Sequence, residues 1–188
     1  MMPSVGSIFK NAVDVIGSLT DNHKDPMHVG ETMACWTYYT FVANIISHEE
    51  IGLNTTTDSD LIKLYQDAYK VTTSHKKELS DLMRQEGIPL SNTSATKPES
   101  NPDAIPLGAK FTDSELINTL NFNFIVAANM CATTASQSLR TDVSLLFLKF
   151  QTDKLSLGLK AKEIMRAKGW LKVPPSYYPP GATQKKST

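Results

Sequence analysis

Two segments far apart in the chain end in the same way: Leu82-Met83-Arg84-Gln85-Glu86-Gly87-Ile88 and Ile164-Met165-Arg166-Ala167-Lys168-Gly169-Trp170. In each, an apolar residue follows the glycine, and proline comes soon after. A glycine just past a helix adopts a left-handed conformation, the apolar residue folds back on the last turn, and proline prevents continuation. The match predicts two helical hairpins with equivalent ends; the alternative is a chance similarity between two helix ends.

The spacing of proline and glycine supports this interpretation. No proline occurs in 27–88 or in 107–173, and no glycine occurs in 53–86 or in 109–157. Because these two residues oppose helix formation most strongly, their joint absence favours long helices over strands. Each block has room for one helical hairpin.

Apolar residues recur at helical spacing in the first block. The first helix carries Glu31, Cys35, Tyr38, Val42, Ile45 and Glu49 on one stripe. We expect it to end near Gly52-Leu53-Asn54, with the turn centred near residues 54–55 and His48-Glu49-Glu50 as a solvated end. The cluster 57–60 offers an N-cap to the second helix, whose stripe is Leu61, Leu64, Tyr65, Ala68, Val71, His75, Leu79 and Leu82.

The second block repeats the pattern. Thr112 and Glu115 form a predicted capping box, and Thr141-Asp142 restarts a fourth helix. The third helix aligns Ile117, Leu120, Phe124, Ala128, Cys131 and Ala135, and the fourth aligns Val143, Leu146, Phe150, Leu157, Ala161 and Ile164.

A polar linker, Pro89 to Lys110, separates the hairpins. Extended, it would reach about 66 Å, whereas the second helix spans only about 45 Å, so the linker can return along the whole bundle. We therefore predict an all-α, ferritin-like four-helix bundle of two antiparallel hairpins joined by a long crossover. It would occupy 26–173, with the crossover at 88–111, an amphipathic N-terminal helix within 1–25, and a Pro/Tyr-rich disordered tail at 174–188.

Composition excludes several classes of protein. Nineteen Lys and Arg balance nineteen Asp and Glu, which removes the electrostatic argument for binding nucleic acid or an anionic membrane. Two cysteines suit a reducing compartment. No apolar run is long enough for a membrane span, and Lys10 and Asp14 interrupt any secretory signal. We expect a soluble protein of the cytoplasm.

The sequence resembles a known family: ferritin-like proteins of uncharacterised function from spore-forming Bacillus-type bacteria, often labelled spore coat proteins and similar to coat protein F. The resemblance rests on 31–36, on His75 and Glu78, and on Lys168-Gly169-Trp170-Leu171 followed by Val173-Pro174-Pro175. It covers roughly 27–180. It implies a four-helix ferritin-like bundle located in the sporulating cell or spore, and it implies no established activity.

Four residues are candidates for a metal site. A ferritin-like di-iron centre needs carboxylates and Glu-x-x-His pairs from both hairpins. His75 and Glu78 lie on one helix face, and pairing across a turn at 54–55 would set Glu31 level with them. The second hairpin lacks a matching pair and offers only Asp153. The alternative to a complete di-iron site is thus a single Fe, Mn or Zn ion held by Glu31, His75, Glu78 and Asp153.

A structural interpretation of the same residues is favoured. A histidine on an apolar stripe is more often a hydrogen-bonded core residue, and Glu31 in a first turn suits the helix dipole. Cys35 and Cys131 also lie on apolar stripes, where thiols are unreactive. We expect a non-enzymatic structural or interaction protein, associated with the spore coat through protein partners or self-association, without cofactor. The alternative is a metal-binding protein with oxygen or peroxide chemistry.

Overall fold

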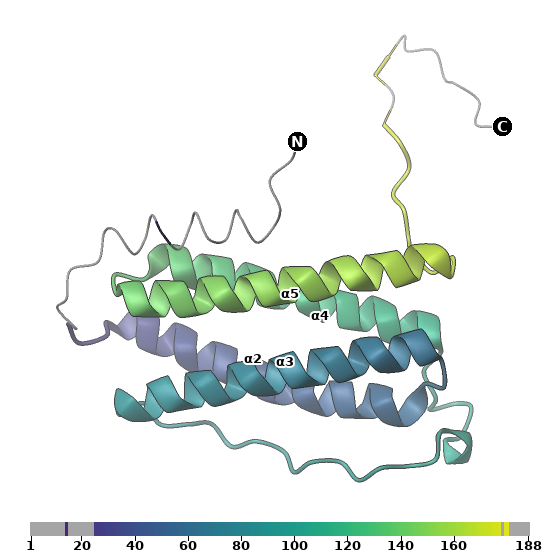
Figure 1. Ribbon diagram of the computed structural model, residues 1–188, viewed down its shortest axis with the longest axis horizontal. Coiled ribbons are helices and arrows are strands. Elements are labelled where there is room, and N and C mark those ends of the chain that lie inside the picture. Colours follow the sequence, from purple (N-terminus) through teal and green to yellow (C-terminus); the bar gives the residue numbers. More distant parts are fainter. Residues whose placement is uncertain (1–13, 15–24, 178, 181–188) are drawn as a thin grey trace.

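The computed structural model describes residues 14, 25–177 and 179–180, and within this part of the chain helix is the only regular secondary structure (Figure 1). The four long helices are α2 (Val29–Thr55), α3 (Ser59–Gln85), α4 (Asp113–Gln137) and α5 (Thr141–Ala167), with a 3-10 turn η1 (Pro102–Ala104). The predicted four-helix bundle is confirmed. The predicted N-terminal helix and the end of the tail lie outside the described residues, apart from Asp14.

The helix ends have the chemistry that the sequence predicts. The Asp58 side chain accepts from the amides of Asp60 and Leu61 at the start of α3, and the Thr112–Glu115 capping box begins α4. Gly87 and Gly169 have φ of 71° and 72°. After each glycine an amide bonds back to the last turn: Ile88 to Met83 and Trp170 to Met165, both at 2.8 Å. These are the paired 6→1 bonds of a Schellman motif, so the two hairpins do end alike.

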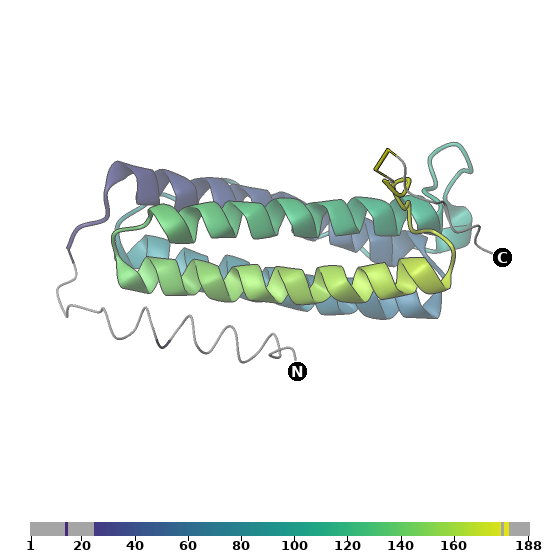
Figure 2. The ribbon, with the colours of Figure 1, turned by 90° about the horizontal axis from the view of Figure 1, so that it is seen from above.

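Every pair of adjacent long helices is antiparallel. The bundle places α2 against α3 and α4, and α5 against α4 and α3. Between α3 and α5, Asp67 contacts Lys160, whereas Glu78, further along α3, contacts Lys149, which lies earlier on α5. Figure 2 shows α4 and α5 side by side along their whole length. No helix in the described ranges is long and apolar enough to cross a membrane.

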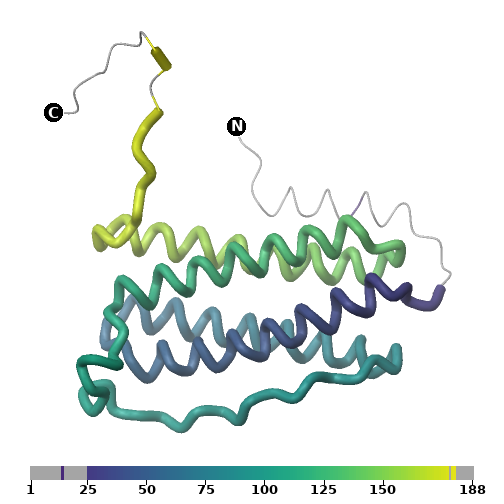
Figure 3. Tube along the Cα trace, turned by 180° about the vertical axis from the view of Figure 1, so that it is seen from behind, coloured from purple at the N-terminus to yellow at the C-terminus, as the bar shows by residue number. Residues whose placement is uncertain are grey.

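The crossover runs along the full length of the bundle, as its length predicts (Figure 3). It follows α2: the Thr40 hydroxyl donates to Ser91 at 2.9 Å, and the Asn54 side chain bonds the carbonyl of Pro98 and the amide of Ser100. These side-chain bonds supply partners to the extended part of the crossover that precedes η1. Each of the four adjacent helix pairs is antiparallel, so α3 and α4 run in the same direction. The end of α3 and the start of α4 therefore lie at opposite ends of the bundle, and only a long connection can join them.

The first helix extends further than predicted. It continues through Gly52 to Thr55, and the turn is centred near residue 57. Gly52 serves packing instead of ending the helix: a Cβ built there would lie 2.2 Å from Cε1 of Tyr65. The shifted turn changes the register of α2 against α3. Tyr38, and not Glu31, therefore faces His75.

The core is divided into two apolar clusters. One contains Cys35, Tyr38, Tyr39, Val42, Leu79, Met83, Ile88, Ala127, Cys131, Val143, Phe147 and Phe150. The other contains Leu61, Leu64, Tyr65, Ala68, Leu116, Ile117, Leu120, Phe124, Leu157, Ala161 and Met165. Along α3 and α5, the residues between the clusters are polar: Thr72 and His75 on α3, and Asp153 and Lys154 on α5. This polar layer is the candidate site.

Candidate functional site

His75 lies at the centre of the polar layer and is fully buried. Its Nε2 lies 3.0 Å from Oδ2 of Asp153, and its Nδ1 lies 3.2 Å from the hydroxyl of Tyr38. Because an ionised carboxylate can only accept, Nε2 carries the proton and donates it, and Nδ1 of the neutral ring accepts from Tyr38. The ring stacks on Phe150 with centroids 4.0 Å apart. Both nitrogens of His75 are thus occupied.

A second buried chain of hydrogen bonds joins three helices. The Lys154 ammonium on α5 donates to Oγ1 of Thr72 on α3 at 2.6 Å, and that hydroxyl donates to Oε1 of Glu49 on α2 at 2.8 Å. Lys154 is 1% exposed and Glu49 is fully buried. Among the described residues, Oε2 of Glu49 has no hydrogen-bond partner. A cation and an acid thus share one hydroxyl inside the bundle.

Burial dominates the protonation of these groups. It raises the pKa of Glu49 to about 7, against the opposing attraction of Lys154 and the hydrogen bond from Thr72. It lowers the pKa of Lys154. It also lowers the pKa of His75, although the hydrogen bond to Asp153 pulls that pKa upward. Each shift favours the neutral form, because the apolar clusters on both sides cannot solvate a charge.

The layer meets solvent at Asp153. This side chain is 39% exposed and lines a groove of about 390 Å³ between α3 and α5, together with His75. Lys149 and Lys160 line the same groove and pair with Glu78 at 2.5 Å and Asp67 at 2.8 Å. The groove therefore holds charges of both signs, mostly paired with each other, and Asp153 and His75 link it to the interior.

The four predicted metal ligands occupy three different environments. His75 and Asp153 are brought together, as described. Glu78 lies near them on the surface, where it accepts from Ser74 at 2.9 Å and pairs with Lys149. Glu31 lies at the α5 start and accepts from the amides of Leu139 at 2.8 Å and Arg140 at 2.9 Å.

In the described part of the chain, no three His, Cys, Asp or Glu residues gather where they could hold a metal ion. The metal site stays a prediction, and only the pair His75 and Asp153 has a geometry suited to it. Its other two members have protein partners that satisfy their carboxylates. The prediction that Glu31 and Glu78 lie at the same height in the bundle assumed a turn at 54–55. It is wrong because the turn lies further along the chain.

The prediction that residues 48–50 form a solvated end is wrong. Glu49 is buried against Thr72, and Glu50 is buried beneath the crossover, where its Oε2 accepts from the amide of Lys97 at 3.0 Å. Lys154 is a further buried residue of this layer that was not predicted. The sequence does indicate that Glu49 is buried, since this residue continues the apolar stripe of α2. The burial of Lys154 is indicated by its position between Phe150 and Leu157, because all three residues face the same side of α5.

The two cysteines are free, buried thiols, as their positions predict. Burial raises the pKa of Cys35 and of Cys131 to about 12. At neutral pH both are protonated and therefore weak nucleophiles. They fill space in the apolar cluster nearer the α2 start.

These features define a class of protein: a four-helix bundle of two hairpins with a long crossover and a buried, internally bonded polar layer. The chain belongs to the family described as "Protein of unknown function (DUF3231)", whose model matches residues 17–182.

Several relatives are similar to the chain. The "Uncharacterized protein YvdQ" of Bacillus subtilis (strain 168) is 29% identical over 161 residues, which cover 85% of this chain and 95% of the relative. A crystal structure from Bacillus halodurans C-125, named "putative spore coat protein (BH2358)", is 31% identical with a TM-score of 0.80, covering 82% of this chain and 98% of its own. A DUF305 fragment from Deinococcus radiodurans has a TM-score of 0.62 at 11% identity and shares the fold alone.

Proposed function

We propose that this protein is a non-enzymatic structural component of the spore, associated with its coat. The observation that carries the proposal is the similarity in sequence and fold to the Bacillus halodurans protein whose name refers to the spore coat. The resemblance to coat protein F-like proteins leads to the same location. Protein partners or copies of the chain would be its ligands.

The chemistry of the interior supports a structural role. The groups best suited to catalysis in this bundle are His75, Lys154 and the two thiols, and each is used in holding helices together or filling the core. A general base needs a free lone pair within reach of a substrate. His75 has its single acceptor nitrogen turned inward to Tyr38. Lys154 reaches Thr72 and not the groove.

Fractionation of spores tests this proposal. The tagged full-length chain would be expressed during sporulation in Bacillus subtilis, and spores would be extracted to separate coat from core. We expect the chain in the coat extract, whereas a tagged cytoplasmic protein expressed from the same promoter should be absent from it. Recovery of the chain only from the mother-cell lysate or the core fraction would contradict the proposal.

The second candidate is a metal-binding protein with oxygen or peroxide chemistry. The contact between His75 and Asp153 favours it, because a histidine and a partly exposed carboxylate at a groove are half of a mononuclear site. Glu78 would have to leave Lys149 to join them. The two side chains alone would leave the ion with an incomplete set of protein ligands.

Elemental analysis separates the two functions. Purified full-length protein and Asp153→Asn would be analysed after equilibration with Fe, Mn or Zn and removal of excess metal. Asparagine keeps the shape of the side chain and removes its charge. Stoichiometric metal that is lost in the variant would establish the second candidate; metal-free wild type would end it. His75→Ala gives an independent check at the other ligand.

A further inference from the structure

The outer side of helix α4 carries no charge. Residues 116–137 include no Asp, Glu, Lys, Arg or His, although every third or fourth position points away from the core. The outermost positions of this stretch are all exposed: Thr119, Phe122, Ile125, Asn129, Thr133 and Ser136. The side of a helix that faces water normally carries charged side chains. The outer side of α4 is therefore better suited to contact with protein than to contact with water.

Helix α3 has the opposite character. Many of its exposed positions are charged, namely Asp60, Lys63, Asp67, Lys70, Lys77, Asp81 and Arg84. The charges of the bundle are thus distributed unevenly between its helices. The centre of a protein–protein interface is depleted of charged residues and enriched in aromatic ones. Helix α4, which exposes Phe122, has that composition, and α3 does not.

Helix α5 extends the uncharged surface. Leu155 and Leu159 are 49% and 52% exposed. Together with Ile125 they line a groove of about 200 Å³ between α4 and α5. Lys162 also lines this groove, but its long side chain can keep the ammonium in water. We define the α4–α5 face as Phe122, Ile125, Asn129, Thr133, Leu155 and Leu159.

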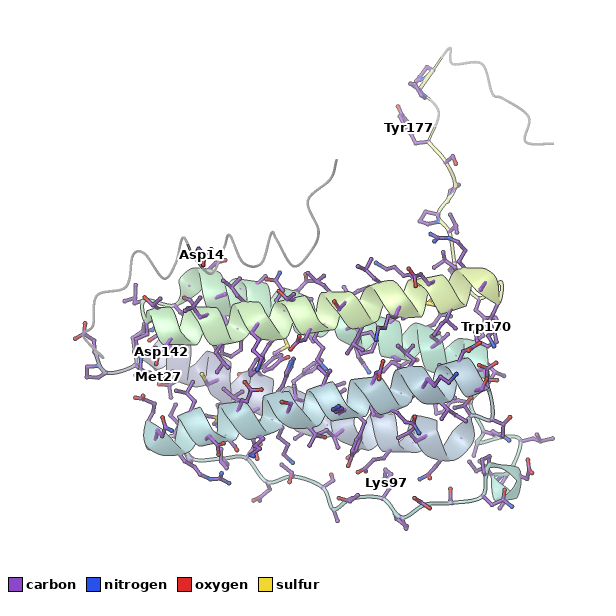
Figure 4. The ribbon with its side chains drawn as sticks, viewed as in Figure 1. Asp14, Met27, Lys97, Asp142, Trp170 and Tyr177 are labelled. Atoms are coloured by element: carbon purple, nitrogen blue, oxygen red, sulfur yellow. The ribbon has the colours of Figure 1, made fainter. Side chains whose placement is uncertain are left out.

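The α4–α5 face lies away from the crossover. Helices α4 and α5 lie side by side (Figure 2), and Figure 4 shows α5 running from Asp142 near its start to Trp170 just beyond its end. The crossover covers a different side of the bundle, where it bonds to Thr40 and Asn54 of α2. The crossover therefore leaves the α4–α5 face uncovered.

The size of this face matches that of a stable dimer interface. At about 1.5 Å per residue, the uncharged stretch 116–137 extends about 33 Å, and two adjacent helices are about 20 Å wide. The product is about 660 Å². A specific, stable interface buries about 600–1,000 Å² on each partner. One α4–α5 face is thus large enough to hold two copies of the chain together.

The face is also complementary to a copy of itself. Phe122 is 63% exposed and lies one helical turn from the apolar groove at Ile125 and Leu155. A two-fold axis between ring and groove would seat the ring of each copy in the groove of the other, which is the reciprocal contact of an isologous interface. Asn129 and Thr133 both donate and accept hydrogen bonds, so each can pair with its own kind. No like charges oppose each other across such a contact.

We infer that the protein forms a two-fold symmetric dimer through the α4–α5 face, with α4 of one copy against α4 of the other. The second copy covers the exposed apolar side chains of this face. The inference rests on the proposed structural role, in which copies of the chain are ligands, and it assigns the surface where they meet. Because an isologous contact uses the same face twice, association ends at two copies.

Sedimentation equilibrium of the purified full-length protein tests this inference. We expect a species of about 41 kDa, twice the 20.7 kDa of one chain, whose mass does not grow as the protein concentration rises. Phe122→Asp places a charge in both halves of the contact and should raise the dissociation constant at least about 100-fold. Met33→Asp is the matched control, because Met33 is 61% exposed on α2, outside the face, and should leave the constant unchanged. Circular dichroism checks that both variants are folded.

Disulfide cross-linking gives a second measure that does not depend on a disruptive substitution. Ile125 lies near the inferred axis, so Ile125→Cys should link to its own copy under mild oxidation. We expect this covalent dimer to form at least about tenfold faster than that of Met33→Cys, because the contact holds the two thiols at a high effective concentration. The native thiols do not interfere, since Cys35 and Cys131 are buried.

Several outcomes would overturn the inference. They are a monomeric wild type, a mass that keeps growing beyond two copies, a folded Phe122→Asp variant that dimerises as the wild type does, and equal cross-linking rates for the two cysteine variants. Each concerns purified protein, so it leaves the location in the spore coat to be decided by fractionation.

Discussion

The carboxylate of Glu31 on α2 accepts a hydrogen bond from the backbone amide of Arg140, the residue that precedes α5, at 2.9 Å. The Arg140 side chain makes no cap for its own helix. Glu31 therefore supplies the negative charge that a helix N-terminus favours, from a different hairpin. Arg140 in turn pairs with Glu86 at 2.8 Å near the α3 end. The residue predicted as a metal ligand is a link between the hairpins.

Removing this link should destabilise the bundle. Glu31→Ala leaves three amides without their acceptor: those of Leu139 and Arg140 before α5, and that of His28 at the start of α2. We expect the free energy of unfolding to fall by about 2–4 kcal/mol. Glu115→Ala is the matched control, because this exposed carboxylate caps only its own helix, so its removal should lower the free energy of unfolding much less. Urea unfolding measures both; equal losses would refute the role of Glu31.

The buried acid Glu49 should make stability depend on pH. Its folded pKa of about 7 lies above the ordinary 4.5, so the folded state holds the proton more tightly. The resulting stabilisation is complete below pH 4.5 and is lost as pH rises through about 7. Glu49→Gln mimics the neutral acid and should remove this fall, which amounts to about 2–3 kcal/mol.

Denaturant unfolding of wild type and Glu49→Gln across this pH range checks the prediction. The quantity of interest is the difference between the two curves, since other groups titrate in both proteins. Thr72→Val gives a second test, because it removes the hydroxyl that donates to Glu49 and so should raise the pKa of Glu49 further. The decrease in the free energy of unfolding should then continue to higher pH. A difference curve that is flat between pH 4.5 and 7 would contradict the assigned protonation.

Two helical glycines should respond in opposite ways to alanine. Gly52→Ala brings a methyl group to 2.2 Å from the Tyr65 ring, and we expect a loss of about 1–3 kcal/mol from overpacking. At Gly158 the nearest atoms are 3.8 Å away, so Gly158→Ala should stabilise by about 1 kcal/mol through helix propensity alone. Thermal unfolding distinguishes the two signs. Stabilisation by both would show that Tyr65 moves freely.

The native thiols should resist modification. With pKa values raised to about 12, Cys35 and Cys131 should not react with Ellman's reagent at pH 8 in the folded protein. Both should react within minutes once the chain is unfolded in guanidinium. Rapid reaction of either thiol in the folded state would show that the apolar cluster opens.

Helix ends were predictable where the signal is local. The capping box of Thr112 and the left-handed glycines Gly87 and Gly169 depend on residues within one turn, and the structure has them as expected. The first turn was predicted too early because a glycine such as Gly52 is typical of a helix end. Glycine is needed there because of a distant residue: the Tyr65 ring occupies the space that a side chain would need. A turn moved by two residues then changed which side chains of α2 and α3 meet.

The sequence by itself determined four helices, their pairing into hairpins and the need for a long crossover, because proline, glycine and apolar periodicity act over a few residues. Only the tertiary structure decided the roles of the buried polar residues. Glu31 finds amides 108 and 109 residues away, and Glu49 reaches Lys154 through a hydroxyl on a third helix. Such partners depend on the register between helices, and register is set by side-chain packing across the whole core.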